Sequence, residues 1–271
     1  MRQELSAEEK WDKATLADNF IFYKVMRSHP EECKELIEML LKVKIQKMEM
    51  HNEEVIAIDH EAKSVRLDVY VKDVSKMYDI EIQVADTMEL PERARYYASL
   101  MALDSLKEGD DYKKLRDGHV IFLCLKDIFH QKLPVYTFEN ICNEDNKTKL
   151  NDRDYKHFFI APLCAKMAKD KEIKEFFEFL ISNSAKNKFT SKLSKYVEDA
   201  KHNQQWRHEY MTYERLQNIM IRYGKDLKAM EDAENMLKKQ YPVNDISEIT
   251  GLPLEKVKEI AEQLVAVPEK Q

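Results

Sequence analysis

The sequence predicts an α/β protein with a mixed β-sheet, followed by a C-terminal part that is almost wholly helical. Three observations support this fold class. Residues 65–71 and 78–84 alternate apolar and polar side chains with the period of two that is typical of β-strands. The run from His119 to Leu125 is continuously apolar, as in a strand that is buried on both faces. Beyond about Asp170, apolar residues recur at steps of three and four, which is the spacing of helices.

Helices are expected over most of residues 5–50. A first helix carries apolar side chains between Phe20 and Val25, and Pro30 suits the first turn of a second one, expected from Glu31 to Met48. A short strand is expected from Glu54 to Asp59, ahead of the two alternating segments. These two should form a hairpin, in which residues 72–77 turn the chain back.

The middle of the chain continues the α/β pattern. Pro91 lies near the start of a strong helix that should run to about Lys107, and Gly109 is a suitable stop. The apolar strand that begins at His119 follows, and shorter strands are expected from Pro134 to Phe138 and from His157 to Ile160. This order of elements describes a mixed sheet with helices packed against it.

The C-terminal part is expected to contain one long helix that ends before Pro242. Its apolar stripe is more typical of packing than of a platform for stacked bases, and it begins with Trp206, Tyr210, Tyr213 and Leu216. Two short helices joined at Gly251 should follow, in the manner of a helix-turn-helix unit. We therefore expect three domains, at residues 1–168, 169–241 and 242–271.

Composition limits the classes of function. The chain of 271 residues has only 4 glycines, which argues against glycine-rich phosphate loops, and its apolar runs are too short to cross a bilayer. The N-terminus is polar and the four cysteines are far apart, so we expect a cytoplasmic protein with no membrane partner. The formal net charge of -6 argues against a protein that coats DNA.

One stretch, residues 186–207, is locally basic, with six positive and two negative side chains. A solvated helix face is the more ordinary interpretation of such a run. The alternative is a local basic groove for nucleic acid, and its candidate DNA-binding residues are Lys188, Lys192 and Lys195.

The hairpin carries the strongest candidate for a functional site. Its alternation places Asp68 on the polar face of the first strand, and Glu81 with Gln83 on the polar face of the second. If these faces coincide, two carboxylates meet over an apolar sheet and repel each other unless a positive group lies between them. A hard divalent cation is the usual solution, because it takes oxygen ligands. The plainer alternative is that these acids lie on an exposed face and serve solubility.

Several segments together resemble one family of enzymes, over about residues 13 to 262. They are the two hairpin strands, the Arg93-Ala94-Arg95-Tyr96-Tyr97 helix, Asp18-Asn19-Phe20, Tyr112-Lys113-Lys114-Leu115 with the following apolar strand, and Ile246 to Pro253. In this order and spacing they resemble the PD-(D/E)XK nuclease superfamily, in its Rpn branch of recombination-promoting nucleases and transposases. The resemblance implies a restriction-endonuclease-like α/β core with a mixed central sheet flanked by helices, followed by a helical C-terminal region.

The resemblance also implies roles for individual residues. Asp68 and Glu81 would bind Mg²⁺ or Mn²⁺ with the backbone carbonyl of Ile82, and Gln83 takes the place of the superfamily's usual lysine. Glutamine lacks the positive charge that stabilises a developing phosphate charge, so the metal would have to do most of the activation of water.

Three further residues are accessory candidates. Arg93 or Arg95 could supply the missing positive charge, and ordinary surface ion pairing is an equally good interpretation of both. Asp18 could extend the site, although an acid at the start of a helix is slightly the better interpretation.

The function expected from this resemblance is Mg²⁺-dependent cleavage of DNA phosphodiester bonds, linked to recombination or mobile DNA. Two alternatives stay open. One is a non-catalytic DNA-binding or regulatory protein on a nuclease fold, for which Gln83 and the helix-turn-helix-like tail argue. The other is a helical interaction module, in which the long helical region self-associates through its apolar stripe. A homodimer is compatible with the nuclease as well, because two sites make it easier to cut two strands.

Overall fold

The computed structural model describes residues 5–50, 69–84 and 89–266. Within it the chain forms two compact units, one over Lys10–Trp206 and the other from Arg207 onward together with the segment before Lys10. The predicted domain boundaries at residues 168 and 241 concern which segments fold on their own, and they stay a prediction. Over the ranges that the structure covers, no helix combines the length and apolar character needed to span a membrane.

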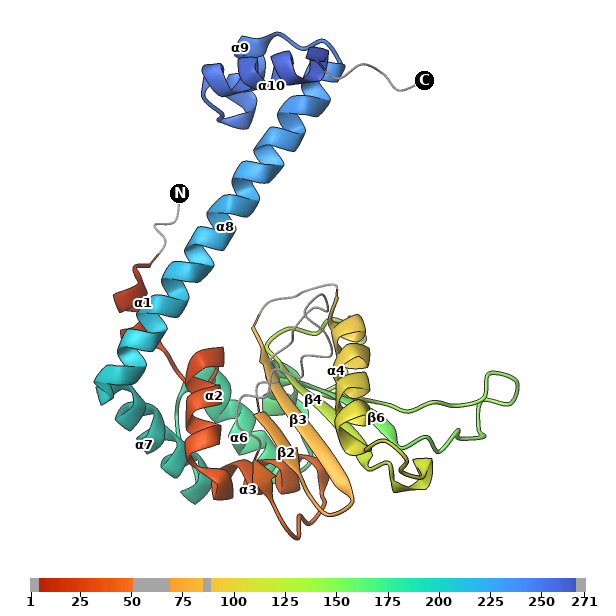
Figure 1. Ribbon diagram of the computed structural model, residues 1–271. Coiled ribbons are helices and arrows are strands. Elements are labelled where there is room, and N and C mark those ends of the chain that lie inside the picture. Colours follow the sequence, from red (N-terminus) through yellow and green to blue (C-terminus); the bar gives the residue numbers. More distant parts are fainter. Residues whose placement is uncertain (1–4, 51–68, 85–88, 267–271) are drawn as a thin grey trace. The chain divides into compact units, whose positions relative to one another are not determined.

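The first unit is built on a mixed β-sheet, as the sequence predicted (Figure 1). The strands in spatial order are β1 (Glu49–Met50), β2 (Val69–Lys72), β3 (Lys76–Gln83), β4 (Asp117–Cys124), β6 (Asp154–Ile160) and β5 (Val135–Phe138). The central pairs β3–β4 and β4–β6 are parallel, and the outer pairs are antiparallel. β3 and β4 are therefore interior strands, and their side chains are buried on both faces.

Helices cover both faces of this sheet. α4 (Leu90–Ser105) packs on one face, where its buried apolar side chains share a core with Val120 and Phe122 of β4. α2 (Asn19–Ser28) contacts β2 and β3, and Phe177 of α6 (Lys171–Ser182) stacks on Phe159 of β6 with ring centroids 5.9 Å apart. The remaining elements of this unit are the end of α1 (Ala7–Lys13), α3 (Pro30–Leu41), a 3₁₀ turn at Tyr112–Lys114, α5 (Ala161–Met167) and α7 (Lys188–His202).

Two boundaries differ clearly from the predictions, and one predicted strand is not tested. The second helix ends at Leu41 instead of Met48, because Lys42 adopts a left-handed conformation with φ of 55°. In the hairpin, β2 ends at Lys72 and β3 begins at Lys76, so the connection consists of residues 73–75 and is shorter than expected. The strand expected from Glu54 to Asp59 lies outside the described residues.

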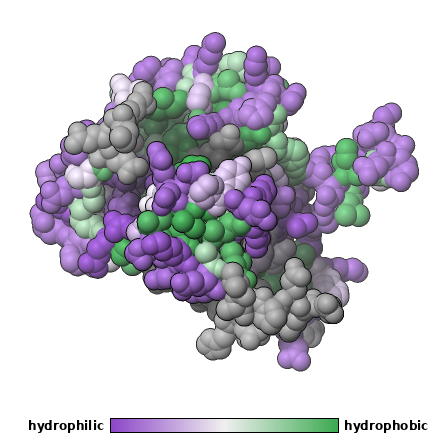
Figure 2. Space-filling model, turned by 90° about the horizontal axis from the view of Figure 1, so that it is seen from above, coloured by the Kyte–Doolittle hydropathy of each residue, from purple (hydrophilic) through white to green (hydrophobic). Residues whose placement is uncertain are grey.

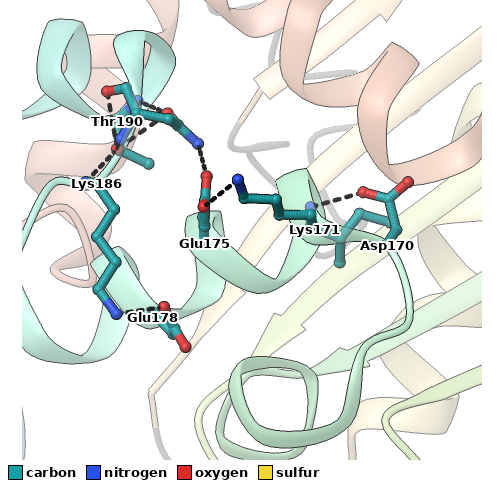
Figure 3. A network of polar contacts seen from close by, with 8 residues as sticks. Asp170, Lys171, Glu175, Glu178, Lys186 and Thr190 are labelled. Carbon is teal, nitrogen blue, oxygen red and sulfur yellow. Dashed lines mark hydrogen bonds and ion pairs between the residues drawn. The ribbon is translucent and has the colours of Figure 1, made fainter.

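Polar contacts join α6 to the start of α7 (Figure 3). Asn187 caps α7 by accepting from the backbone N–H of Thr190 at 2.8 Å, and its own amide donates to Glu175 of α6 at 2.8 Å. Nearby, Lys186 forms a 2.7 Å ion pair with Glu178. Part of the positive charge of the basic stretch is thus balanced by acids of the same fold.

The second unit contains most of α8 (Gln204–Lys238) with α9 (Val243–Thr250) and α10 (Leu254–Ala266). α9 and α10 pack on the end of α8 through a small core of Ala233, Ile246, Val257 and Ile260. Gly251 ends α9 with φ of 72°, a left-handed conformation that glycine adopts without strain. The two-helix tail predicted from the sequence is confirmed.

Candidate active site

The polar side chains of β3 lie beneath α4. Asp79, Glu81 and Gln83 alternate along one face of the strand together with Met77, which belongs to the core that α4 covers. They are 0%, 2% and 7% exposed. For Glu81, the alternative that the acids of the hairpin lie on an exposed face is therefore wrong. For Asp68, which lies outside the described residues, it stays open. A buried carboxylate is costly without a positive or hydrogen-bonding partner, so this face needs one.

Arg93 of α4 is that partner. Its guanidinium donates to the Glu81 carboxylate over 2.6 Å and to the side-chain oxygen of Gln83 over 2.8 Å. It also donates to the hydroxyl of Tyr97, one helical turn further on, at 2.9 and 3.2 Å. Below it lie the rings of Tyr97 and Phe122, with centroids 5.4 and 5.7 Å from the guanidinium carbon. Arg93 is therefore held in place by hydrogen bonds to Glu81, Gln83 and the Tyr97 hydroxyl and by contact with two aromatic rings.

The packing of α4 decides which arginine reaches the sheet. Leu90, Ala94 and Tyr97 are buried at helical spacing, so Arg93 is beside the buried stripe, whereas Arg95 is exposed. Of the two arginines suggested by the sequence, the structure brings Arg93 to Glu81 and Gln83. Surface ion pairing does not describe Arg93, because its carboxylate partner is 2% exposed.

Asp68 lies outside the described residues. The neighbouring ladder is described, and it pairs Val69 with Ile80 in antiparallel register. The backbone carbonyl of Gln83 accepts from the backbone N–H of Leu125, on the β4 side, at 3.0 Å. Because carbonyl groups alternate in direction along a strand, the Ile82 carbonyl is directed to the β2 side.

The donors available on β3 suit a hard cation. The Glu81 carboxylate and the Ile82 carbonyl are oxygen ligands of the kind that Mg²⁺ and Mn²⁺ take. Among the residues that the structure describes, no three His, Cys, Asp or Glu side chains cluster closely enough to hold a metal ion by themselves. A site here would therefore need a further ligand in addition to Glu81.

Asp18 has a local structural role. It precedes α2, and its carboxylate accepts from the backbone N–H groups of Phe20 at 2.9 Å and Ile21 at 3.2 Å. This is the geometry of a helix N-cap. The interpretation of Asp18 as a helix-start acid is the one that these contacts support.

The three lysines proposed for DNA binding lie on α7. Lys192 forms a 3.0 Å ion pair with Glu32 of α3, and Glu32 is 6% exposed. Burial alone would raise the pKa of Glu32, but the hydrogen bond and charge of Lys192 hold it below its ordinary value. Lys188 and Lys195 are exposed. No contact brings these lysines to Glu81 among the described residues.

Sequence reasoning missed two residues of this site. Asp79 is fully buried two positions before Glu81 on the same face, opposite Tyr70 of β2. Tyr97 is 6% exposed, and burial followed by the negative charge of Glu81 raises its pKa. The period of two along β3 and the four-residue step from Arg93 could have indicated both.

Comparison with known proteins identifies the family of the chain. Residues 23–240 match the family model of the PD-(D/E)XK nuclease family transposases. The match contains the hairpin, α4 and the whole of α8, and it ends before the α9–α10 tail. No curated protein and no solved structure is significantly similar to the chain. Because the family model covers most of its length, the chain belongs to the PD-(D/E)XK nuclease family transposases.

Proposed function

We propose that this protein is a divalent-cation-dependent endonuclease that hydrolyses DNA phosphodiester bonds, in the context of recombination or mobile DNA. The observation that carries the proposal is the buried carboxylate of Glu81, held beside Gln83 by Arg93 at the end of an interior strand. Buried charges assembled in this way are frequent at catalytic sites. Membership of a nuclease family supplies the reaction class.

Asp68 and Glu81 are the proposed metal ligands, with the Ile82 carbonyl as the third. The ladder that pairs Val69 with Ile80 supports this set, because one further pair in the same register would join positions 68 and 81. Residues directly opposite in an antiparallel pair share a face, with Cβ atoms about 5 Å apart. When bound, Mg²⁺ or Mn²⁺ would supply Lewis acidity toward the phosphate and a more acidic water.

Arg93 is proposed to provide the positive charge that a lysine provides at position 83 in the superfamily. Its guanidinium is permanently charged and presents several donors in a planar fork, which suits phosphate oxygens as well as carboxylates. Gln83 would orient a water through its amide, because it carries no charge. The site would then combine acidic and basic elements from β3 and α4, with Tyr97 positioning Arg93.

The C-terminal tail does not favour the alternative of a DNA-binding protein without catalysis. The exposed charged residues of α9 and α10 are mostly acidic: Asp245, Glu248, Glu255, Glu259 and Glu262, against Lys256 and Lys258. Both lysines form ion pairs within α10, at 2.8 and 3.1 Å. Helices that read DNA carry a basic surface toward the phosphates, which is the opposite of this distribution.

The decisive experiment compares plasmid cleavage with Mg²⁺ by the full chain and by Asp68→Ala and Glu81→Gln. We expect both substitutions to reduce cleavage by more than about 100-fold, because each would remove a ligand. Glu92→Gln is the matched control, since Glu92 is an exposed acid next to Arg93 on α4.

Equal cleavage by all four proteins would remove the catalytic assignment. Calorimetric titration with Mn²⁺ separates the remaining cases. If the unaltered chain binds DNA but neither Mn²⁺ nor Mg²⁺, the non-catalytic alternative is correct.

A further inference from the structure

An apolar stripe on α8 is exposed over two heptads. Its residues follow at steps of three, four, three and four: Tyr213, Leu216, Met220, Tyr223 and Leu227. They are between 41% and 67% exposed. This spacing is that of the a and d positions of a coiled coil, where apolar side chains of one helix insert between those of another.

Exposed apolar residues alone are ordinary on protein surfaces, and the surface seen in Figure 2 alternates hydrophilic areas with hydrophobic ones. The α8 stripe differs because it continues in register into a covered part. The series continues with Met230, Glu234 and Leu237. Of these three, the apolar Met230 and Leu237 pack against the core that α9 and α10 form with Ala233. The tail thus covers the C-terminal end of the stripe, whereas Leu216, Met220, Tyr223 and Leu227 are exposed on the described surface.

We propose that this stripe is the interface with a second copy of the chain, which binds through its own α8 in antiparallel orientation. The distribution of charge along α8 favours a second copy of the chain as the partner. Residues 207–225 contain four basic and two acidic side chains, a net charge of +2, and residues 226–238 contain two basic and four acidic ones, a net charge of -2. A helix with opposite charge in its two halves is complementary to itself when it is reversed.

The flanking positions also disfavour a parallel pair. In a parallel coiled coil, Asp226 would be at a g position opposite Glu231 at e of the other copy, so like charges would meet twice. Gly224 lies at the e position beside the exposed stripe, and a Cβ added to it would meet no other atom within 4 Å outside its own helix. Glycine within a helix lowers its stability by about 1 kcal/mol relative to alanine. The lack of a side chain at Gly224 would let a second helix approach closely, which would account for glycine at this position.

Sedimentation velocity of the full chain at several concentrations tests the interface. We expect a dimer at micromolar concentration, and at least a tenfold weaker dimer for Met220→Glu. Asn218→Glu is the matched control, because it adds the same charge to an exposed position two residues away on the same helix. Circular dichroism and plasmid cleavage verify that each variant is folded.

Two outcomes would overturn the proposal. One is a monomer at all concentrations, which would mean that the stripe is covered within the chain or by another protein. The other is an equal dimer dissociation constant for the Met220→Glu and Asn218→Glu variants.

Disulfide trapping tests the orientation. In a Cys142→Ser background, protein with Leu216→Cys is mixed with protein with Leu227→Cys under mild oxidation. An antiparallel pair that places Leu216 opposite Leu227 of the second copy gives the mixed disulfide. Disulfides formed only between identical chains would establish a parallel pair and contradict the proposal.

Discussion

The guanidinium of Arg93 lies 2.6 Å from the carboxylate of Glu81, and the two residues come from a helix and from an interior strand of the sheet. Glu81 is 2% exposed, whereas a third of the Arg93 side chain is exposed. The pair therefore connects a buried acid to the surface of the molecule. A bound cation would compete with Arg93 for the Glu81 carboxylate, and a DNA phosphate would compete with Glu81 for the Arg93 guanidinium.

Arg93→Met is expected to destabilise the protein and to change its response to metal. The variant leaves the Glu81 carboxylate buried without this guanidinium, at a cost of about 3 kcal/mol in the free energy of unfolding. A divalent cation should then stabilise the variant more than it stabilises the original chain, as measured by thermal denaturation with and without Mn²⁺. Arg95→Met is the control, because Arg95 is exposed on the same helix. Equal effects of the two substitutions would contradict the role given to Arg93.

Exchange of charge between positions 83 and 93 should rescue activity. Gln83→Lys alone places a second positive charge beside Arg93, since the Gln83 oxygen now accepts from Arg93 at 2.8 Å, and we expect lower stability without a gain in cleavage. In the Arg93→Met background, the same lysine restores one positive charge next to Glu81. Cleavage by the double variant should exceed that by Arg93→Met at least tenfold. If the double variant were no more active than Arg93→Met, the contribution of Arg93 to cleavage would not be its positive charge next to Glu81.

The histidines of β4 and β6 predict a loss of stability in mild acid. The Nδ1 atom of His119 lies 3.1 Å from Nε2 of His157, and the ring of His119 stacks on Tyr78 and Tyr155. Burial, followed by the charge of His157, lowers the pKa of His119 to about 3, and burial lowers that of His157 to about 4. Both rings are therefore neutral in the folded protein at pH 5, while in the unfolded chain they bind protons below about pH 6.5.

The direction of this change in stability follows from proton binding. Because the unfolded state takes up more protons, the free energy of unfolding falls as the pH drops from about 6.5 toward the folded values, by about 2 kcal/mol per histidine at pH 5. His157→Gln removes one of the two groups. Urea unfolding at pH 7 and pH 5 should thus show a smaller acid loss for the variant than for the original chain. Identical losses would mean that these rings do not stay neutral.

The lysines of α7 should separate into structural and DNA-contacting residues. Lys192 is engaged with Glu32 at 3.0 Å, so Lys192→Ala should lower the thermal stability and leave the salt dependence of DNA binding unchanged. If Lys188 and Lys195 contact phosphates, replacing both by alanine should reduce the slope of log affinity against log salt by about 2. Fluorescence anisotropy with a labelled duplex at several salt concentrations measures these slopes. An unchanged slope in the double variant would remove both lysines from the interface.

Local patterns sufficed for most of the secondary structure. The period of two marked β2 and β3, the continuous apolar run marked β4, and Pro242 with Gly251 bounded the helices of the tail. The error at Lys42 arose because a left-handed residue ended α3 without a glycine or proline to signal it. Such a conformation is decided by packing around the turn, which the residue type alone does not disclose.

By itself the sequence determined the class of the fold, the family, and the face of β3 on which Glu81 and Gln83 lie, because these follow from periodicity and from the spacing of motifs. The tertiary structure alone decided that this face is buried beneath α4, and that Arg93 instead of Arg95 pairs with Glu81. It also decided that the charge of Lys192 is balanced by Glu32 and that the α8 stripe is exposed. The physical reason is the same in each case: burial and ion pairing depend on segments that are distant along the chain and meet only when the helices pack on the sheet.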